Sequence, residues 1–599
     1  MQKRFLSPLL ILSVLLNTVT GRLLRNANET LSTEYDFIIV GAGTAGCVVA
    51  NRLTESPNSR VLLIEAGISD AGLAAEVPYY SPTLTPNKGP WDWNYTVMPQ
   101  EALNNRTFPY PRGKVLGGSS TVNYLVFNRG GIDDFDRIAN ISGDQGWSWD
   151  ALEPYMRKLE RLTPPADGHN TTGQFIPEAH GFDGSLLTSL PGYPTPIDGL
   201  IMNATTQIAG YPFNKDMNKG DETGIGWVFG SLGGEMPERS SSAAAYLRPI
   251  LNRANLDVLI EHQVTRLIQT GIQGGIPELK GVEFSQGPNE PVFNLTANNE
   301  IVLSAGSVGT PQILLLSGIG DQADLEAVGI ETIAQVADVG RNLQDHPLLP
   351  NQFYVNSEDT WEKASRNASI AAQQLQQYNE TGQGPLVNTI CNHIGWLRVP
   401  DNSSIWANAT DPSAGPTVGH YELVFTNGFV GPIQSLPDTG NFMTVISNLI
   451  TPASRGTLKL NTSSPWDAPL IDPALLKEPI DLLILREAHK SALQFVSAPA
   501  FDGYISGPYG TVGAITDEDI DAYIRNFTTT VWHPVSTATM SASNDTSGVV
   551  SPELLVKNVT GVRVVDASIF PFVPSAHPEA AIYIIAERAS DIIRTAWGV

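Results

Sequence analysis

Short runs of apolar, often β-branched residues alternate along the chain with glycine-rich turns and amphipathic stretches, and this pattern predicts an α/β fold. Phe37–Val40 and Val61–Ile64 are continuous apolar runs of the kind that form buried parallel strands. The segment between them opens on a glycine-rich turn and continues as a helix. Tyr35–Gly67 therefore predicts a strand, a turn, a helix and a second strand.

The same reasoning predicts elements elsewhere. Asn255–Ile268 is rich in β-forming residues, and Arg455–Asp472 predicts strand, turn and strand. Thr516–Asn526 predicts a capped helix, and Arg239–Arg248 predicts a helix start with serine capping. Glu300–Gly306 predicts a further strand that ends at a glycine.

Composition and charge narrow the class of protein. A chain of 599 residues is too long for one hydrophobic core, which predicts two joined domains or one large domain with a cap. An apolar content of 42% with 16% charged residues is typical of globular proteins. The net charge of −25 argues against nucleic-acid partners and anionic membranes, because both require basic surfaces.

Residues 1–21 predict a secretory signal peptide. Two basic residues precede the apolar run Phe5–Leu16, which is shorter than the ~20 residues of a spanning helix, and small residues follow it. Asn-x-Ser/Thr sequons recur along the chain. An Asn- and Thr-rich chain yields some sequons by chance, but behind a signal peptide they favour a secreted glycoprotein. A disulfide between Cys47 and Cys391 is disfavoured, and a buried thiol is the ordinary interpretation of Cys47.

The turn after the first strand predicts a dinucleotide site. Gly41, Gly43 and Gly46 form GxGxxG: the first allows the tight turn, the second lets the backbone approach a pyrophosphate, and the third lets helix and strand pack closely. Glu65 ends the second strand, where its carboxylate can accept hydrogen bonds from a ribose diol. The alternative is a glycine-rich turn without a ligand. This unit alone does not separate FAD from NAD.

Several later segments together resemble a known family. Tyr110–Ala139 contains a second glycine turn, Gly117-Gly118, followed by hydroxyl residues that can lie against a flat ligand or a phosphate. This stretch resembles the first signature of the glucose–methanol–choline (GMC) oxidoreductases, and Gly306–Gly320 resembles the second. Val339–His346 and Val562–Ile593 also match. Within the family, Asp92–Thr96, Pro164–Gly181 and Leu190–Gly199 resemble the fungal aryl-alcohol oxidases.

The resemblance implies FAD in a Rossmann-like domain and the oxidation of an alcohol to an aldehyde. Some members attach FAD through a histidine in the first signature; here Lys114 and Val122 stand at the corresponding positions, so we expect non-covalent FAD. The implied cofactor-binding residues are Gly41, Gly43, Thr44, Ala45, Gly46, Glu65, Gly117, Gly118, Ser119, Asn123, Val264, Asp566 and Ala567.

The resemblance also implies the domain organisation. We expect a discontinuous FAD-binding domain made of residues 34–160, 233–345 and 556–599. Residues 161–232 and 346–555 should form a substrate-binding domain, an α+β unit containing an antiparallel sheet.

Two His-Pro pairs near the C-terminus carry the expected chemistry. His533 and His577 match in order and spacing the family positions beside the flavin. A neutral imidazole can take the alcohol proton near neutral pH while the flavin accepts the hydride. We therefore expect His533 to be the general base and His577 to hold the substrate oxygen. A lone His-Pro would more often be a hydrogen-bonded core histidine, as we expect of the other seven.

Aromatic and acidic residues are expected on the substrate side. Tyr124 falls on the family's active-site tyrosine, and Trp532 stands where aryl-alcohol oxidases carry phenylalanine. The loop Glu422–Pro432 resembles one that carries an aromatic gate, for which Phe429 and Val430 are the candidates. Glu422 matches a carboxylate near the histidines, with a surface carboxylate as the alternative. Pro578-Glu579 departs from the Thr-Gln of those relatives.

Three functions remain open. The first is a secreted aryl-alcohol oxidase that produces H2O2, with a role in lignin degradation. The second is a sugar or alcohol dehydrogenase that reduces quinones, and the third is a flavin-containing hydroxynitrile lyase. No histidine or cysteine spacing suggests a metal site. The expected partners are a small alcohol and O2 or a quinone, with no nucleic acid or membrane, and a monomer is expected.

Overall fold

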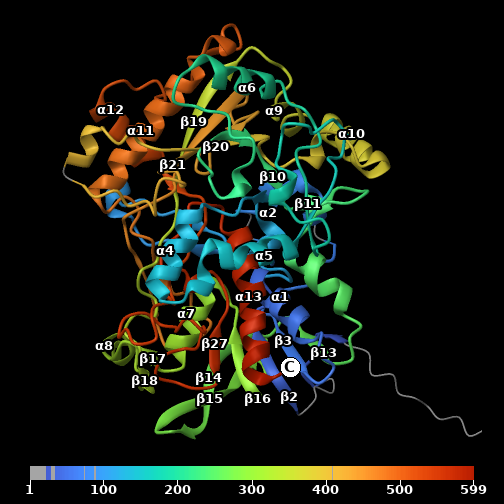
Figure 1. Cartoon of the computed structure of the whole chain (residues 1–599), viewed down its shortest axis with the longest axis vertical. Coiled ribbons are helices and arrows are strands. Elements are labelled where there is room, and N and C mark those ends of the chain that lie inside the picture. The colour runs from blue at the N-terminus through green and yellow to red at the C-terminus, as the bar shows by residue number, and fades with distance from the viewer. Residues whose placement is uncertain (1–21, 29–33, 73, 87–88, 408) are drawn as a thin grey trace, which may run out of the picture.

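The computed structural model describes residues 22–28, 34–72, 74–86, 89–407 and 409–599. Two sheets lie in two parts of an elongated molecule (Figure 1). The predicted signal peptide lies outside the described residues. The α/β fold class with a second, antiparallel part is confirmed.

The first sheet is built from the predicted apolar runs. Its parallel strands pair in the order β1, β13, β3, β2, β16, and β27 also pairs with β16. β2 and β3 are almost wholly buried, which explains their unbroken apolar sequences. The long β16 continues into an antiparallel meander with β15 and β14. The bounds are β1 Arg22–Leu24, β2 Tyr35–Val40, β3 Val61–Ile64, β13 Leu256–Leu259, β14 Gln263–Gln273, β15 Ile276–Ser285, β16 Phe293–Leu303 and β27 Val562–Val564.

Two helices from opposite ends of the sequence lie side by side against this sheet. α1 (Thr44–Leu53) and α13 (Glu579–Trp597) run together in Figure 1. Arg52 joins them with an ion pair to Glu587, 2.7 Å from Nη2 to Oε1. A third helix, α7 (Gly306–Leu316), follows β16. The C-terminal helix is thereby fixed with its first residue at the end of the sheet where the glycine turn lies.

The second sheet is antiparallel. Its order is β20, β21, β22, β19, β25, and β26 pairs with the start of β19. β21 and β22 are buried on both faces. The helices α11 (Pro479–Val496) and α12 (Asp517–Phe527) lie over this sheet (Figure 1). The bounds are β19 Pro347–Val355, β20 His393–Leu397, β21 Tyr421–Thr426, β22 Phe442–Leu449, β25 Ile505–Pro508 and β26 Thr529–Thr530.

Three elements predicted from short sequence patterns can be compared with the structure. β23 (Thr457–Lys459) pairs with β24 (Leu470–Asp472), as predicted for Arg455–Asp472. Thr516 caps α12 by accepting a hydrogen bond from the Asp519 N–H. The predicted serine-capped helix at Arg239–Arg248 is only one π-helical turn, Ala243–Leu247, with Ser241 Oγ accepting from the Ala244 N–H.

Shorter elements connect the sheets. The remaining α-helices are α2 Ser81–Leu84, α3 Ser119–Val122, α4 Ile132–Ser142, α5 Trp149–Leu159, α6 Asp198–Gln207, α8 Gln322–Ala327, α9 Glu362–Ser365 and α10 Ala368–Thr381. The short strands are β4 Tyr95–Thr96, β5 Pro109–Tyr110, β6 Val126–Phe127, β7 Glu160–Leu162, β8 Leu186–Thr188, β9 Gly224–Trp227, β10 Phe229–Gly230, β11 Leu232–Gly233, β12 Glu238–Arg239, β17 Ile319–Gly320 and β18 Ala334–Gln335.

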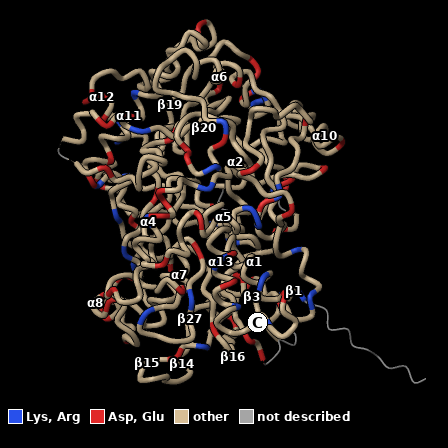
Figure 2. The backbone as a smooth tube through the Cα atoms, viewed as in Figure 1, with Lys and Arg blue, Asp and Glu red and all other residues tan. Residues whose placement is uncertain are grey.

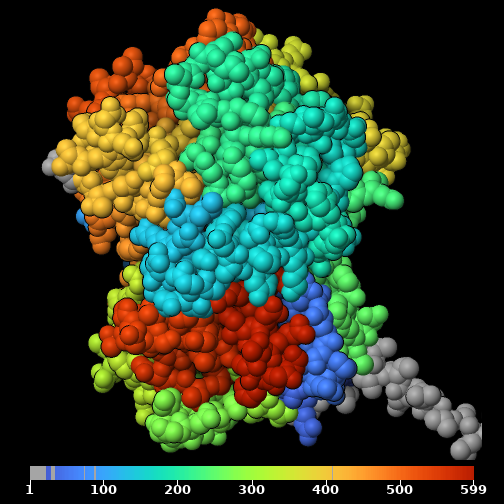
Figure 3. Space-filling view, in the orientation of Figure 1, coloured from blue at the N-terminus to red at the C-terminus, as the bar shows by residue number. Residues whose placement is uncertain are grey.

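The strands of the first sheet fall within the segments expected for the FAD-binding domain, apart from β1, and those of the second within the substrate-binding segments. The domain boundaries themselves remain a prediction. The space-filling view shows the N- and C-terminal segments meeting in one part of the molecule (Figure 3). Acidic and basic residues are scattered over both parts (Figure 2). No helix within the described ranges is long and apolar enough to cross a membrane.

Candidate active site

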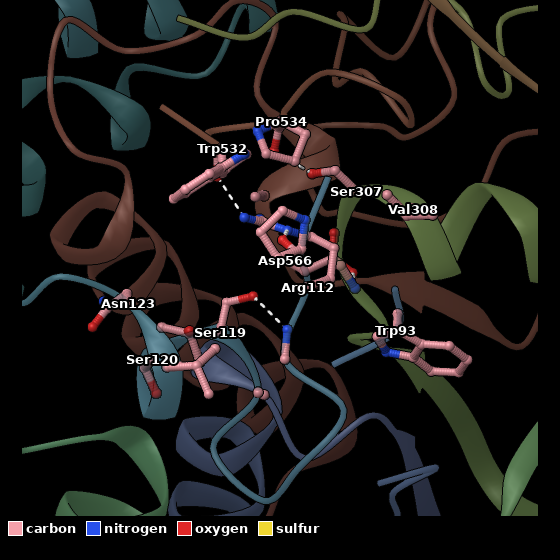
Figure 4. Close-up of a pocket in the computed structure, with 18 of the residues that line it drawn as sticks. Trp93, Arg112, Ser119, Ser120, Asn123, Ser307, Val308, Trp532, Pro534 and Asp566 are labelled. Atoms are coloured by element: carbon pink, nitrogen blue, oxygen red, sulfur yellow. Dashed lines mark hydrogen bonds between the residues drawn. The ribbon is translucent and has the colours of Figure 1, made fainter. Parts of the chain in front are cut away.

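A cavity of about 310 Å³ lies between the two sheets (Figure 4). Its walls come from the glycine turn after β2, the second glycine turn, the antiparallel sheet and the two His-Pro loops. The predicted residues that line it are Gly41, Gly43, Thr44, Ala45, Glu65, Gly118, Ser119, Asn123, Tyr124, Val264, Trp532, His533, Asp566, Ala567 and His577.

The first glycine turn has the geometry that its motif predicts. Gly41 has φ +99°, and a Cβ there would lie 2.5 Å from the Ser304 carbonyl oxygen. Gly46 packs behind the turn, where a Cβ would lie 1.9 Å from the Gly41 oxygen. Glu65 accepts hydrogen bonds from the N–H groups of Ala42 and Gly67, each at 2.8 Å. Burial raises the pKa of Glu65 to about 7.

The two glycine turns meet. Gly118 has φ +54°, and a Cβ there would lie 2.8 Å from the Gly43 Cα. Gly117, with φ +85°, donates its N–H to the Ala42 carbonyl at 2.8 Å and lies behind the contact. Ser119 accepts a hydrogen bond from the Gly113 N–H, drawn in Figure 4. Because these glycines have no side chains, a ligand in the cavity can lie directly against the backbone of both turns, as the sequence predicted.

Polar groups on the same wall fit a dinucleotide. Ser304 Oγ is buried with no hydrogen-bond partner among the described residues. Asp566 fixes the start of α7 by accepting from the Gly306 N–H at 2.9 Å and the Thr310 hydroxyl at 2.6 Å. Two glycine turns, a buried acid at the end of β3 and a free hydroxyl are groups that can hold the ribose and phosphates of FAD.

His533 and His577 come together. Their ring centroids lie 4.7 Å apart with the planes at 70°, and both side chains line the cavity. His533 follows β26, and His577 lies two positions before the first residue of α13. The fold therefore unites the two His-Pro pairs on one wall.

Glu422 lies behind His577. Its Oε1 is 2.9 Å from His577 Nε2, and its Oε2 accepts from the Asn448 amide at 2.5 Å. The Glu422 side chain is fully buried, which excludes the surface alternative. The backbone N–H of His577 donates a hydrogen bond to Asn128 Oδ1 at 3.0 Å. Glu422 thus positions the His577 ring from β21.

Sequence reasoning missed a third histidine. His346 Nδ1 lies 3.0 Å from His533 Nδ1, with the rings at 82°. We had expected His346 to be an ordinary core residue, and it is fully buried. Asp345 Oδ1 accepts the backbone N–H groups of both His346 and His533, at 2.8 and 2.7 Å. The sequence did contain a signal for this site, because Asp345 and His346 end the family-like stretch Val339–His346.

Burial keeps this pair of rings neutral. It holds the pKa of His533 well below the ordinary histidine value, and the neighbouring His577 and His346 lower it further. Burial and then His577 lower the pKa of His346 to about 3. A neutral His533 is the form that can accept a proton.

Aromatic residues cover the cavity beside the histidines. Trp532 has φ +63°, an unusual backbone conformation for a bulky residue. Arg112, which sequence reasoning also missed, donates to the Trp532 carbonyl at 2.5 Å, as Figure 4 shows. Tyr124 lies 6.2 Å from the Trp532 ring and donates its hydroxyl to the Thr85 carbonyl at 3.0 Å.

The gate residue needs a correction. Phe429 packs edge-on against Phe442 and Tyr509, with centroids at 5.1 and 5.6 Å, and does not face the cavity. Val430 and the neighbouring Pro432 line the cavity instead. A rigid aromatic cluster holds the Phe429 ring, so the smaller side chain faces inward. Other apolar lining residues are Leu348, Ile390, Val424, Ile446 and Val531.

The structure also places the two cysteines and the two residues at the family's covalent-attachment positions. Cys47 and Cys391 are buried free thiols. Lys114 lies over the Trp93 ring, 4.7 Å from its centroid, and Val122 lines the cavity. Among the residues that the structure describes, no group of three or more His, Cys, Asp or Glu is arranged to hold a metal ion.

Comparison with known proteins agrees with this geometry. Residues 35–348 match a family model described as GMC oxidoreductase, and residues 452–586 match a second with the same description. The dehydrogenase eriK of Hericium erinaceus is 38% identical over 95% of this chain and 96% of that protein. Pyranose dehydrogenase 3 of Leucoagaricus meleagris is 36% identical, covering 94% and 93%. A solved fungal aryl-alcohol oxidase superposes with TM-score 0.83 at 29% identity, covering 95% of this chain and all of that one.

Proposed function

Because the chain belongs to the GMC oxidoreductases, a family of FAD-dependent enzymes, we propose that it oxidises aromatic (benzylic or allylic) primary alcohols to aldehydes and reduces O2 to H2O2. FAD would be bound without a covalent link. The observation that carries the oxidation of an alcohol is the pair of His533 and His577 rings, 4.7 Å apart on the cavity wall, and the apolar side chains beside them favour an aromatic alcohol.

The two histidines divide the work on the alcohol. When bound, FAD supplies the acceptor for the hydride that leaves the alcohol carbon. His533 is neutral and takes the hydroxyl proton, so the carbonyl of the aldehyde can form. Glu422 lies 2.9 Å from His577 Nε2, so the His577 ring is fixed beside His533, where the substrate hydroxyl would bind. Glu422 thereby fixes the orientation of the ring that positions the substrate.

The walls support an apolar substrate. Tyr124 and Trp532 offer aromatic faces, and Val424, Val430 and Ile446 offer aliphatic ones. Such surfaces favour a planar, apolar alcohol, whereas each hydroxyl of a sugar would need a hydrogen-bond partner of its own.

A second candidate is a sugar dehydrogenase that reduces a quinone. It is favoured by the 36% identity to a pyranose dehydrogenase over 94% of this chain. The two functions share the histidines and differ in substrate and electron acceptor.

We expect faster peroxide production with p-anisyl alcohol than with glucose, because the walls beside the histidines are mostly apolar. Turnover is measured for both alcohols with O2 and with a benzoquinone acceptor. Efficient glucose oxidation that requires quinone and yields no peroxide would establish the second candidate instead.

Protonation of His533 should not limit flavin reduction at about pH 6.5, the ordinary histidine value, because the neutral form of His533 persists while pH stays above its lowered pKa. The loss of rate that protonation of His533 causes should appear only as pH drops through that low value. Anaerobic stopped-flow reduction by p-anisyl alcohol measures it. Half-loss near pH 6.5, the ordinary histidine value, would contradict a buried neutral base.

The cellular setting is also part of the proposal. The N-terminal pattern and the sequons support a secreted glycoprotein, acting as a monomer. In that setting the peroxide produced would serve lignin degradation.

A further inference from the structure

Glu579 places a carboxyl group on the wall of the cofactor cavity. It is the first residue of α13, two positions after His577, and its side chain lines the cavity while being buried. Oε2 accepts a hydrogen bond from the Ser231 hydroxyl at 2.9 Å. Oε1 is buried with no hydrogen-bond partner among the described residues. Apart from the Asn123 amide, which lies close enough to lower the pKa of the carboxyl group, this oxygen is free to carry a proton.

The surroundings of Glu579 shift its pKa in opposite directions. Burial raises the pKa of Glu579 to about 7, while the Ser231 hydroxyl, the Arg239 charge, the Asn123 amide and His577 lower it. Arg239 is itself buried and donates to Asn123 Oδ1 at 2.6 Å. Tyr583, one helical turn along α13, also lies within electrostatic range of Glu579.

The start of α13 faces the same cavity. Pro578, Glu579 and Ile582 all line it. The N-terminus of a helix carries partial positive charge and favours a negative charge placed before it. An ionised Glu579 offsets that effect, whereas a protonated Glu579 leaves it intact. The two protonation states of Glu579 therefore produce different electrostatic potentials at a bound flavin ring.

We propose that Glu579 is a buried carboxyl group at the wall of the cofactor cavity whose protonation state sets the reduction potential of the bound flavin and makes that potential depend on pH. This inference rests on the binding of FAD in the proposed function. Reduction adds negative charge to the flavin, which disfavours a neighbouring carboxylate and favours the carboxylic acid. Each reduction should therefore draw an additional fraction of a proton onto Glu579.

The test compares midpoint potentials of the wild type and Glu579→Gln from about pH 6 to about pH 8, a window that brackets the Glu579 pKa. We expect a higher potential and a shallower pH dependence in Glu579→Gln, because its amide stays neutral. Glu553 is an exposed carboxylate outside the cavity, so Glu553→Gln should have the midpoint potentials of the wild type at each pH. Ser231→Ala should keep the steep region but move it to higher pH, because the hydroxyl that lowers the Glu579 pKa is gone.

The outcomes separate the two claims. A wild-type protein without flavin absorbance would overturn the proposed function. Equal potentials and slopes in FAD-loaded wild type and Glu579→Gln would overturn the role of Glu579 alone. If Glu579→Gln does not fold, proton uptake on reduction of the wild type decides the point. Uptake that changes with pH around neutrality, with a carboxyl band in infrared difference spectra, supports the proposal; constant uptake without that band refutes it.

Discussion

Replacing His533 with alanine should abolish reduction of the bound flavin by alcohol while leaving FAD in place. The imidazole is the only proton acceptor assigned to the hydroxyl, and removing a general base costs about 10²–10⁴ in rate. The groups that fit FAD, such as Glu65, Gly118 and Asp566, lie on other segments and should be unaffected. Anaerobic stopped-flow absorbance gives the reduction rate, and the spectrum of the purified protein gives the FAD content.

A matched control comes from a histidine outside the site. His169 is partly exposed and hydrogen-bonds to Asp167, so His169→Ala should reduce its flavin at the wild-type rate. Reduction at full speed in His533→Ala would remove His533 from the mechanism. Loss of FAD from that variant would instead show that His533 has a cofactor-binding role.

Replacing His346 with phenylalanine should slow flavin reduction by about 10–100-fold, by analogy with the loss of the hydrogen-bond partners that orient metal-binding histidines. For His533 Nε2 to accept the substrate proton, its Nδ1 must carry hydrogen. That hydrogen has His346 Nδ1 as its acceptor at 3.0 Å. Phenylalanine keeps a ring of similar shape in the buried site but removes the acceptor.

The readout must separate orientation from packing. We expect kcat to fall more than KM rises in His346→Phe, because the substrate contacts of Tyr124 and Trp532 are intact. His346→Gln retains a polar atom near Nδ1 and should recover part of the rate. A wild-type kcat in His346→Phe, with an unchanged melting temperature, would show that the histidine pair has no catalytic consequence.

The site divides into parts that the sequence could and could not predict. The glycine turn was predictable from its motif, in which a Cβ at Gly46 would meet the Gly41 oxygen. The Ser304 oxygen that excludes a Cβ at Gly41, by contrast, comes from a distant segment. The pairing of His533 with His577 was predicted only through the family resemblance. The inward position of Val430 in place of Phe429 depended on Phe442 and Tyr509, which come from distant segments.

The sequence alone determined the α/β class, the buried parallel strands and the turn at Gly41. The class and the strands depend on apolar periodicity, and the turn depends on the close approach of Gly46 to the Gly41 oxygen within one motif. Only the tertiary structure decided that His346 orients His533 and that Glu579 faces the cofactor cavity. The first depends on the pairing of β26 with β19, which brings His533 beside His346, and the second depends on the packing of the N-terminus of α13 at the cavity wall. A single hydrogen bond between distant segments leaves no periodic trace in a sequence.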